Sequence, residues 1–147
     1  MKSIVLILNL TFLFCINSYG QVYNKLADSE VDSKKVEIAK KFAFNYMTAQ
    51  KNNTFYQFID EAIDILKSQL TEERQKAGYK QLKDIFGDFE SLEYAETWIQ
   101  KDNSVYKIIR FKSGFEKSTN KLEIRVILNE SDKIAGFWIK PWSDMMK

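Results

Sequence analysis

The sequence predicts an α+β fold in which three N-terminal helices pack on one face of a curved, four-stranded antiparallel sheet. Two observations carry this prediction. Apolar residues recur at helical spacing as far as Gly87, and from Phe89 onward they alternate with a period of two. The predicted strands follow one another through short polar turns, which is typical of an antiparallel meander whose helices are gathered on one side.

Residues 1–20 have the features of a secretory signal peptide. Lys2 gives a positive start, residues 4–16 are almost wholly apolar, and Ser18 and Gly20 are the small residues that a signal peptidase requires. We expect cleavage after Gly20, because the apolar run is shorter than the roughly 20 residues that cross a bilayer. The mature protein is therefore expected in the periplasm or the medium, without membrane attachment.

Cys15 raises a second interpretation of this leader, since the lipidated cysteine of a lipoprotein ends a similar apolar run. The bulky Phe14 stands where the processing enzyme requires a small residue, so we do not expect lipidation. Cleavage after residue 20 also removes the single cysteine, and the core alone must then stabilise the mature chain. Residues 21–32 are polar and aperiodic and predict a flexible lead-in, followed by one domain over residues 33–147.

Three helices are expected before Gly87. The first covers residues 33–50 and presents a broad apolar face. The second begins at Thr54, which forms a capping box with Gln57, and continues as an apolar stripe to residue 66. The third begins after Thr71 and ends at Gly87, since glycine accepts the left-handed conformation of a helix C-cap without penalty.

Four strands are expected over residues 89–100, 105–112, 121–129 and 134–139. In the last strand, Gly136 predicts a bulge or the close approach of another element. Phe137 and Trp138 should point to opposite faces of the sheet. Pro141 has no N–H group to donate and is expected to end the ladder.

The third helix ends in Gly87-Asp88-Phe89, and the last strand reads Asp132-Lys133-Ile134-Ala135-Gly136-Phe137 with Pro141 after it. With the order of the elements, these residues resemble the exported domain of unknown function 3887 over roughly residues 36–142. The resemblance implies a cone-shaped fold similar to the cystatin-like and nuclear-transport-factor-2-like superfamily. The resemblance offers no catalytic residues to carry over. It implies a domain that either precedes an α/β-hydrolase domain or stands alone as an exported protein.

Several kinds of chemistry are excluded by composition. The chain has no histidine and a single cysteine, which excludes His-dependent nucleophilic catalysis and makes zinc, copper and haem sites improbable. With five glycines there is no phosphate-binding glycine-rich loop. The 22 basic and 20 acidic residues are scattered and nearly balanced, so we expect no nucleic-acid binding. No metal and no cofactor are predicted.

Glu96 is the carboxylate of greatest interest. Strict alternation places it between Tyr94 and Trp98, on a face that is otherwise apolar. A carboxylate desolvated in a pocket there would have a raised pKa suited to proton transfer. Alternatively, a bulge or an edge position turns Glu96 toward water, where it pairs with a lysine.

Two further pairs of charged residues leave alternatives open. Asp60 and Asp64, one turn apart on the second predicted helix, can bind a hard cation or divide acid and base roles, or they lie on a solvated helix face. Arg110 and Arg125 lie on adjacent strands, where they can hold an acidic ligand or form cross-strand pairs with neighbours such as Glu123.

The leading hypothesis is a non-catalytic exported domain that binds a small apolar ligand or a partner protein in the concave face of its sheet. Glu96, Trp98 and Trp138 are the predicted ligand-binding residues, and Trp142 is a candidate contact residue beyond the last strand. One alternative is a small isomerase or hydratase that uses Glu96 as its base. Another is an accessory module of a separate α/β-hydrolase. The oligomeric state is not predicted.

Overall fold

A computed structural model describes residues 22–101 and 103–146, and the predicted signal peptide lies outside these ranges. The helices are the 3-10 turn η1 (Asp28–Glu30), α1 (Ser33–Lys51), α2 (Asp64–Gln69) and α3 (Glu72–Phe86). The strands are β1 (Tyr23–Lys25), β2 (Phe89–Lys101), β3 (Val105–Phe115), β4 (Leu122–Leu128) and β5 (Ile134–Pro141). Within the described ranges, no helix is both long enough and apolar enough to span a bilayer.

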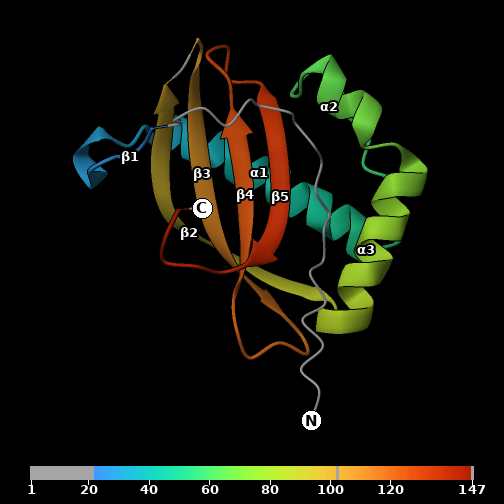
Figure 1. Ribbon diagram of the computed structural model, residues 1–147. Helices are drawn as coiled ribbons and strands as arrows, with labels where there is room; N and C mark the ends of the chain where they lie inside the picture. Colours follow the sequence, from blue (N-terminus) through green and yellow to red (C-terminus); the bar gives the residue numbers. More distant parts are fainter. Residues whose placement is uncertain (1–21, 102, 147) are drawn as a thin grey trace.

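The strands form one antiparallel sheet in the order β1-β2-β3-β4-β5, and α1 crosses behind it while α2 and α3 lie beside β5 (Figure 1). The predicted α+β class and three α-helices are confirmed for the described residues. The prediction of four strands is wrong, because residues 23–25 add a fifth. This segment of the predicted flexible lead-in pairs its backbone with residues 98–100 of β2. Three residues are too few to show an alternation that sequence reasoning can detect.

The core lies between α1 and the sheet. Asp32 caps α1 by accepting a hydrogen bond from the Lys34 amide at 3.0 Å. The predicted apolar face of α1 is buried at Ala39, Phe42, Ala43, Tyr46 and Met47. It packs against the alternate residues of the sheet that face it, among them Ile109, Phe111, Ile124, Val126 and Phe137.

The second predicted helix is much shorter than expected. Residues 54–63 are irregular, and only Asp64–Gln69 is helical. Tertiary partners bind the backbone groups that a helix would use: the Ile63 amide donates to the Ile134 carbonyl at 3.0 Å, and the Ile134 amide donates to the Glu61 carbonyl at 2.7 Å. The segment thus attaches to the start of β5, and these hydrogen bonds override its helical apolar pattern.

The third helix and its caps are confirmed. Thr71 accepts a hydrogen bond from the Arg74 amide at 3.4 Å, and Gly87 follows Phe86 with a φ of +79°. A side chain at this position would be strained and would also meet Glu116.

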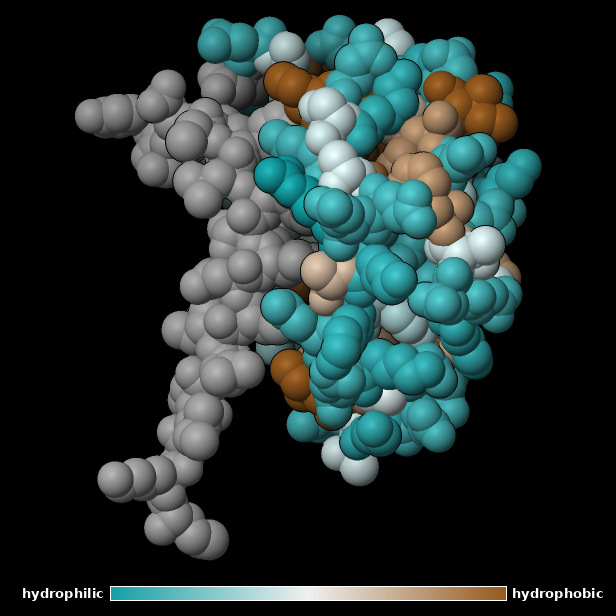
Figure 2. All heavy atoms as spheres, turned by 90° about the vertical axis from the view of Figure 1, so that its right-hand side faces the viewer, coloured by the Kyte–Doolittle hydropathy of each residue, from teal (hydrophilic) through white to brown (hydrophobic). Residues whose placement is uncertain are grey.

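The side of the molecule that carries α2 and α3 is largely hydrophilic, with separate hydrophobic patches (Figure 2).

The features predicted for the last strand are confirmed. A register shift between β4 and β5 leaves Ala135 as an extra residue, which is a β-bulge next to Gly136. The indole of Trp138 lies over Gly136, where a Cβ atom would come within 2.4 Å of the ring. Phe137 is in the core and Trp138 is on the opposite face, and β5 ends at Pro141.

Candidate functional site

A bulge in β2 decides where Glu96 points. Tyr94 pairs with Phe111 and Glu96 pairs with Arg110, so β2 advances two residues where β3 advances one. Tyr94 therefore packs with Phe111 toward α1, whereas Glu96 lies on the opposite face. The prediction that Tyr94, Glu96 and Trp98 share one face is wrong for Tyr94, because strict alternation does not hold across the extra residue.

The face of the sheet opposite to α1 is named here the helix-free face. On this face, residues that lie opposite one another on neighbouring strands form rows across the sheet, and the backbone register gives the members of each row. One row consists of Glu96, Arg110, Arg125 and Trp138, and the next consists of Trp98, Ile108, Ile127 and Gly136. The predicted residues Glu96, Trp98 and Trp138 thus share a face. Glu96 and Trp138 are nevertheless three strand spacings apart, or about 14 Å, so they do not line a single small pocket.

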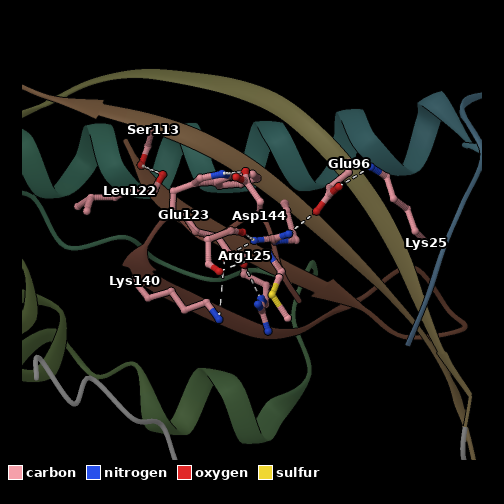
Figure 3. Close-up of polar contacts among 12 residues, drawn as sticks. Lys25, Glu96, Ser113, Leu122, Glu123, Arg125, Lys140 and Asp144 are labelled. Atoms are coloured by element: carbon pink, nitrogen blue, oxygen red, sulfur yellow. Dashed lines mark hydrogen bonds and ion pairs between the residues drawn. The ribbon is translucent and has the colours of Figure 1, made fainter. Parts of the chain in front are cut away.

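The helix-free face holds a network of paired charges (Figure 3). Arg110 Nη1 donates a hydrogen bond to Glu96 Oε1. Arg110 Nη2 donates to Glu123 Oε2 at 2.8 Å. Arg125 Nε donates to Glu123 Oε1 at 2.6 Å, and Lys25 Nζ lies 2.7 Å from Glu96 Oε2. The side chains of Arg110 and Glu123 have no exposed surface. The predicted cross-strand pairing with Glu123 is confirmed for Arg110, although this pair is buried and not on an exposed surface. Arg125 also pairs with Glu123, but both residues belong to β4, so that pair lies within one strand.

The two acids of this network are held in their charged form. Burial alone would raise the pKa of Glu96, but the hydrogen bond from Lys25 and the positive charges of Arg110 and Lys25 hold it below its ordinary value. Burial would also raise the pKa of Glu123, but hydrogen bonds from Arg110 and Arg125 lower it below its ordinary value. Of the two alternatives for Glu96, the structure shows the bulge and the lysine partner and not the raised pKa. The side chain is nevertheless mostly buried by this network and is not turned toward water.

The C-terminal segment, residues 142–146, lies against the network. The ring centroid of Trp142 is 4.4 Å from the Arg110 guanidinium carbon and 4.8 Å from Lys112 Nζ. Arg110 also donates to the Ser143 carbonyl oxygen, and the Trp142 indole N–H donates to Asp144 at 2.9 Å. The segment after β5 returns in front of the sheet, on the side away from α1 (Figure 1).

The acids predicted on the second helix do not come together. Asp60 lies in the irregular segment and pairs with Lys133 at 2.8 Å, whereas Asp64 begins α2 and pairs with Lys67 at 2.8 Å. Hydrogen bonds and charge from these lysines lower the pKa of both carboxyls. In the described part of the chain, no three potential ligands gather into a metal site.

A cavity of about 290 Å³ lies away from the sheet, between the end of α1, residues 53–55 and one side of α3. Sequence reasoning missed it. The available signal was the spacing of Lys76, Lys80 and Lys83, which places them along one face of α3, but only the packed structure brings Lys51 opposite to them.

The family model for the protein of unknown function DUF3887 matches residues 39–137, which is more than half of the chain. The chain belongs to this family. The resemblance that the sequence carried is thereby confirmed for DUF3887, while the link to the cone-shaped superfamily stays a prediction. A comparison with curated proteins found no match.

A similar solved structure supports the fold of this DUF3887 chain. It is the NMR structure of a protein from Ruminococcus gnavus ATCC 29149, with 17% sequence identity and a TM-score of 0.57. The alignment covers 81% of the present chain and 99% of the other. At this identity the likeness concerns the fold alone.

Proposed function

We propose that the chain is an exported, non-catalytic module whose helix-free face binds a partner protein. The observation that supports this most directly is that the face already holds a polypeptide segment. Trp142 stacks on Arg110 and Lys112, and the Ser143 carbonyl accepts a hydrogen bond from Arg110. The chain's own C-terminal residues thus exemplify the chemistry that a partner segment would use.

The state of Glu96 supports a binding role over catalysis. A general base needs a pKa near the working pH and a free lone pair directed at the substrate. Glu96 has a lowered pKa, and its two oxygens are engaged by Lys25 and Arg110. A carboxylate held in this way contributes structure and charge more readily than proton transfer.

The side chains on the helix-free face favour a protein over a small apolar ligand. Tryptophan and arginine are enriched at the centres of protein interfaces, and this face presents Trp98, Trp138 and Trp142 around two arginines. Lys25 on β1 and Lys140 on β5 add positive charge toward the two edges. We therefore propose a partner segment that carries an aromatic residue with acidic residues beside it.

A site-specific photocrosslinker tests this proposal. It is placed at Trp138 in one variant and at Lys40, an exposed position of α1 on the other side of the sheet, in a second variant. In cells that export the protein, position 138 is expected to capture a defined partner that position 40 does not. With the purified partner, Trp138→Ala and Trp98→Ala should weaken binding, each by at least about 1 kcal/mol for a central contact. Equal capture from both positions would refute a binding role for this face, and a co-purifying apolar molecule would favour the small-ligand alternative.

Export has its own test. The mass and N-terminal sequence of the protein recovered from the culture medium or the periplasm should show a chain that begins at Gln21. A lipid-modified Cys15 in the membrane fraction would contradict the proposed processing.

A further inference from the structure

The cavity between α1 and α3 has the chemistry of an anion-binding site. Its lining comes from the end of α1, from residues 53–55 and from the side of α3 between Glu72 and Lys83, and its volume is about 290 Å³. We propose that it binds a small molecule that joins a phosphate or carboxylate group to an apolar ring. This site is distinct from the helix-free face and does not depend on the function proposed for that face.

The floor of the cavity is rigid. Gln75 is buried, and its side-chain oxygen accepts hydrogen bonds from Gln50 Nε2 at 2.6 Å and from the Tyr56 amide at 3.0 Å. Its side-chain nitrogen donates to the carbonyls of Tyr56 and Leu70 at 3.0 Å and 2.9 Å. These bonds tie α1, α3 and the intervening loop together. The positions of the lining residues are therefore set before a ligand arrives, which reduces the entropic cost of binding.

The charges around the cavity are unbalanced. Its lining contains four lysines and one carboxylate, and these charged residues are Lys51, Lys76, Lys80, Lys83 and Glu72. Two of the lysines are neutralised, since Lys80 pairs with Asp84 at 2.7 Å and Lys83 pairs with Asp88 at 3.0 Å.

In the part of the chain that the structure describes, the other two lysines form no direct ion pair, although the charge of Lys51 also acts at longer range on Asp88, the partner of Lys83. Among the described residues, no carboxylate lies within 4.0 Å of Lys51 or Lys76, and Lys51 donates only to the Phe89 carbonyl, at 3.0 Å. Lysine ammonium groups recognise phosphate and carboxylate as point charges, without the fixed geometry of an arginine fork. A single anionic group between these two lysines would compensate their charge.

Two aromatic rings line the cavity beside the polar side chains of Gln50, Asn53, Thr54 and Gln75. Phe55 contributes a ring with 37% of its surface exposed, and Tyr79 contributes a buried ring whose hydroxyl donates to Asp88 at 2.9 Å. Burial raises the pKa of Tyr79 to about 12, so this side chain adds no negative charge at neutral pH. A volume near the lower end of the roughly 300–1,000 Å³ typical of ligand pockets suits a molecule of one ring and one anionic group.

The test uses phenyl phosphate as the probe, with inorganic phosphate and phenol as its separate halves. Binding to the purified chain is followed by two-dimensional NMR of backbone amides. Phenyl phosphate is expected to shift the signals of residues 51–55 and 72–83 and to bind more tightly than either half. The Lys76→Gln variant should weaken binding about threefold to fivefold, as for the loss of one partly exposed ion pair. Phe55→Ala should weaken binding of phenyl phosphate and leave that of inorganic phosphate unchanged.

Lys40→Gln is the matched control, because it removes one exposed lysine from α1, about 15 Å along the helix from the cavity. It should leave the affinity unchanged, and higher salt should weaken binding to the wild-type chain. The proposal is overturned if phenyl phosphate shifts no signals around the cavity at millimolar concentration. It is also overturned if Lys40→Gln weakens binding as much as Lys76→Gln, or if inorganic phosphate alone binds as tightly as phenyl phosphate.

Discussion

Replacing Glu123 with glutamine removes the negative charge from the centre of the network but preserves the shape of the side chain. Glu123 receives hydrogen bonds from Arg110 and Arg125, and Lys140 Nζ lies 3.9 Å from it. In the Glu123→Gln variant these cations face a neutral acceptor. The variant therefore measures the energetic contribution of the charge apart from the contribution of packing.

The burial of the network sets the size of the effect. Neither Glu123 nor Arg110 has any exposed side-chain surface, so water cannot replace the lost interaction. Removing one partner of a buried ion pair costs about 3–5 kcal/mol. Arg110 keeps Glu96 as a partner, and glutamine can still accept a hydrogen bond, so we expect about 3 kcal/mol. That is a large share of the roughly 5–15 kcal/mol that stabilises a typical domain.

Urea unfolding followed by circular dichroism measures the loss. With a typical slope of about 1.5–2 kcal/mol per molar, the midpoint should fall by about 1.5–2 M. Glu93→Gln is the matched control: Glu93 lies in the same row of the sheet as Glu123 but is exposed. Its unfolding free energy should change by less than about 0.5 kcal/mol.

The pH dependence gives a second readout. Because the folded-state pKa of Glu123 is lowered, the stabilisation from its charge is complete above the ordinary glutamate value of about 4.3. It is lost as the pH falls through the folded-state value. The difference in stability between the wild-type chain and Glu123→Gln should therefore be full at pH 7 and shrink below about pH 4. If Glu123→Gln lowers the free energy of unfolding at pH 7 by less than about 1 kcal/mol, or by no more than Glu93→Gln does, the reasoning that the network is buried and coupled is refuted.

Three further changes test other parts of the structure. Gly136→Ala places a methyl group 2.4 Å from the Trp138 ring and should cost about 1–3 kcal/mol, seen as a lower melting temperature; an unchanged value would show that the ring does not lie there. Gln75→Leu leaves Gln50 and the Tyr56 backbone groups without their buried partner and should cost at least about 1–3 kcal/mol by urea unfolding, whereas the exposed Gln81→Leu should be nearly neutral. Trp142→Ala removes the ring from Arg110 and Lys112 and should cost about 0.5–2 kcal/mol, and a fully stable variant would argue that the C-terminal segment contributes little to the fold.

Patterns that depend on a single element were predicted correctly. The apolar face of α1, the Thr71 and Gly87 caps of α3 and the alternation of β4 all follow from local geometry. Helical and strand periods are properties of a few consecutive residues, so they can be read without knowing what packs against them. The glycine and proline of the last strand were informative for the same reason, since each restricts its own backbone.

Two errors arose where a distant segment supplied the decisive partner, and a third arose from a bulge within a strand. Residues 54–63 have a helical apolar pattern, but hydrogen bonds to β5 and to Gln75 hold them in an irregular conformation. Residues 23–25 have no strand pattern, and the free edge of β2 makes them a strand. The direction of Glu96 depends on one extra residue in β2, which strict alternation cannot show.

The sequence by itself determined the family, the α+β class, and the absence of histidine from the chain and of cysteine after residue 15, because motifs, local period and composition suffice for these. Only the tertiary structure decided that Glu96, Arg110, Glu123 and Arg125 form one network, and that Lys51 from α1 faces the lysines of α3. Strand register and helix packing create both arrangements. They join residues far apart in the chain, whose proximity no local pattern specifies.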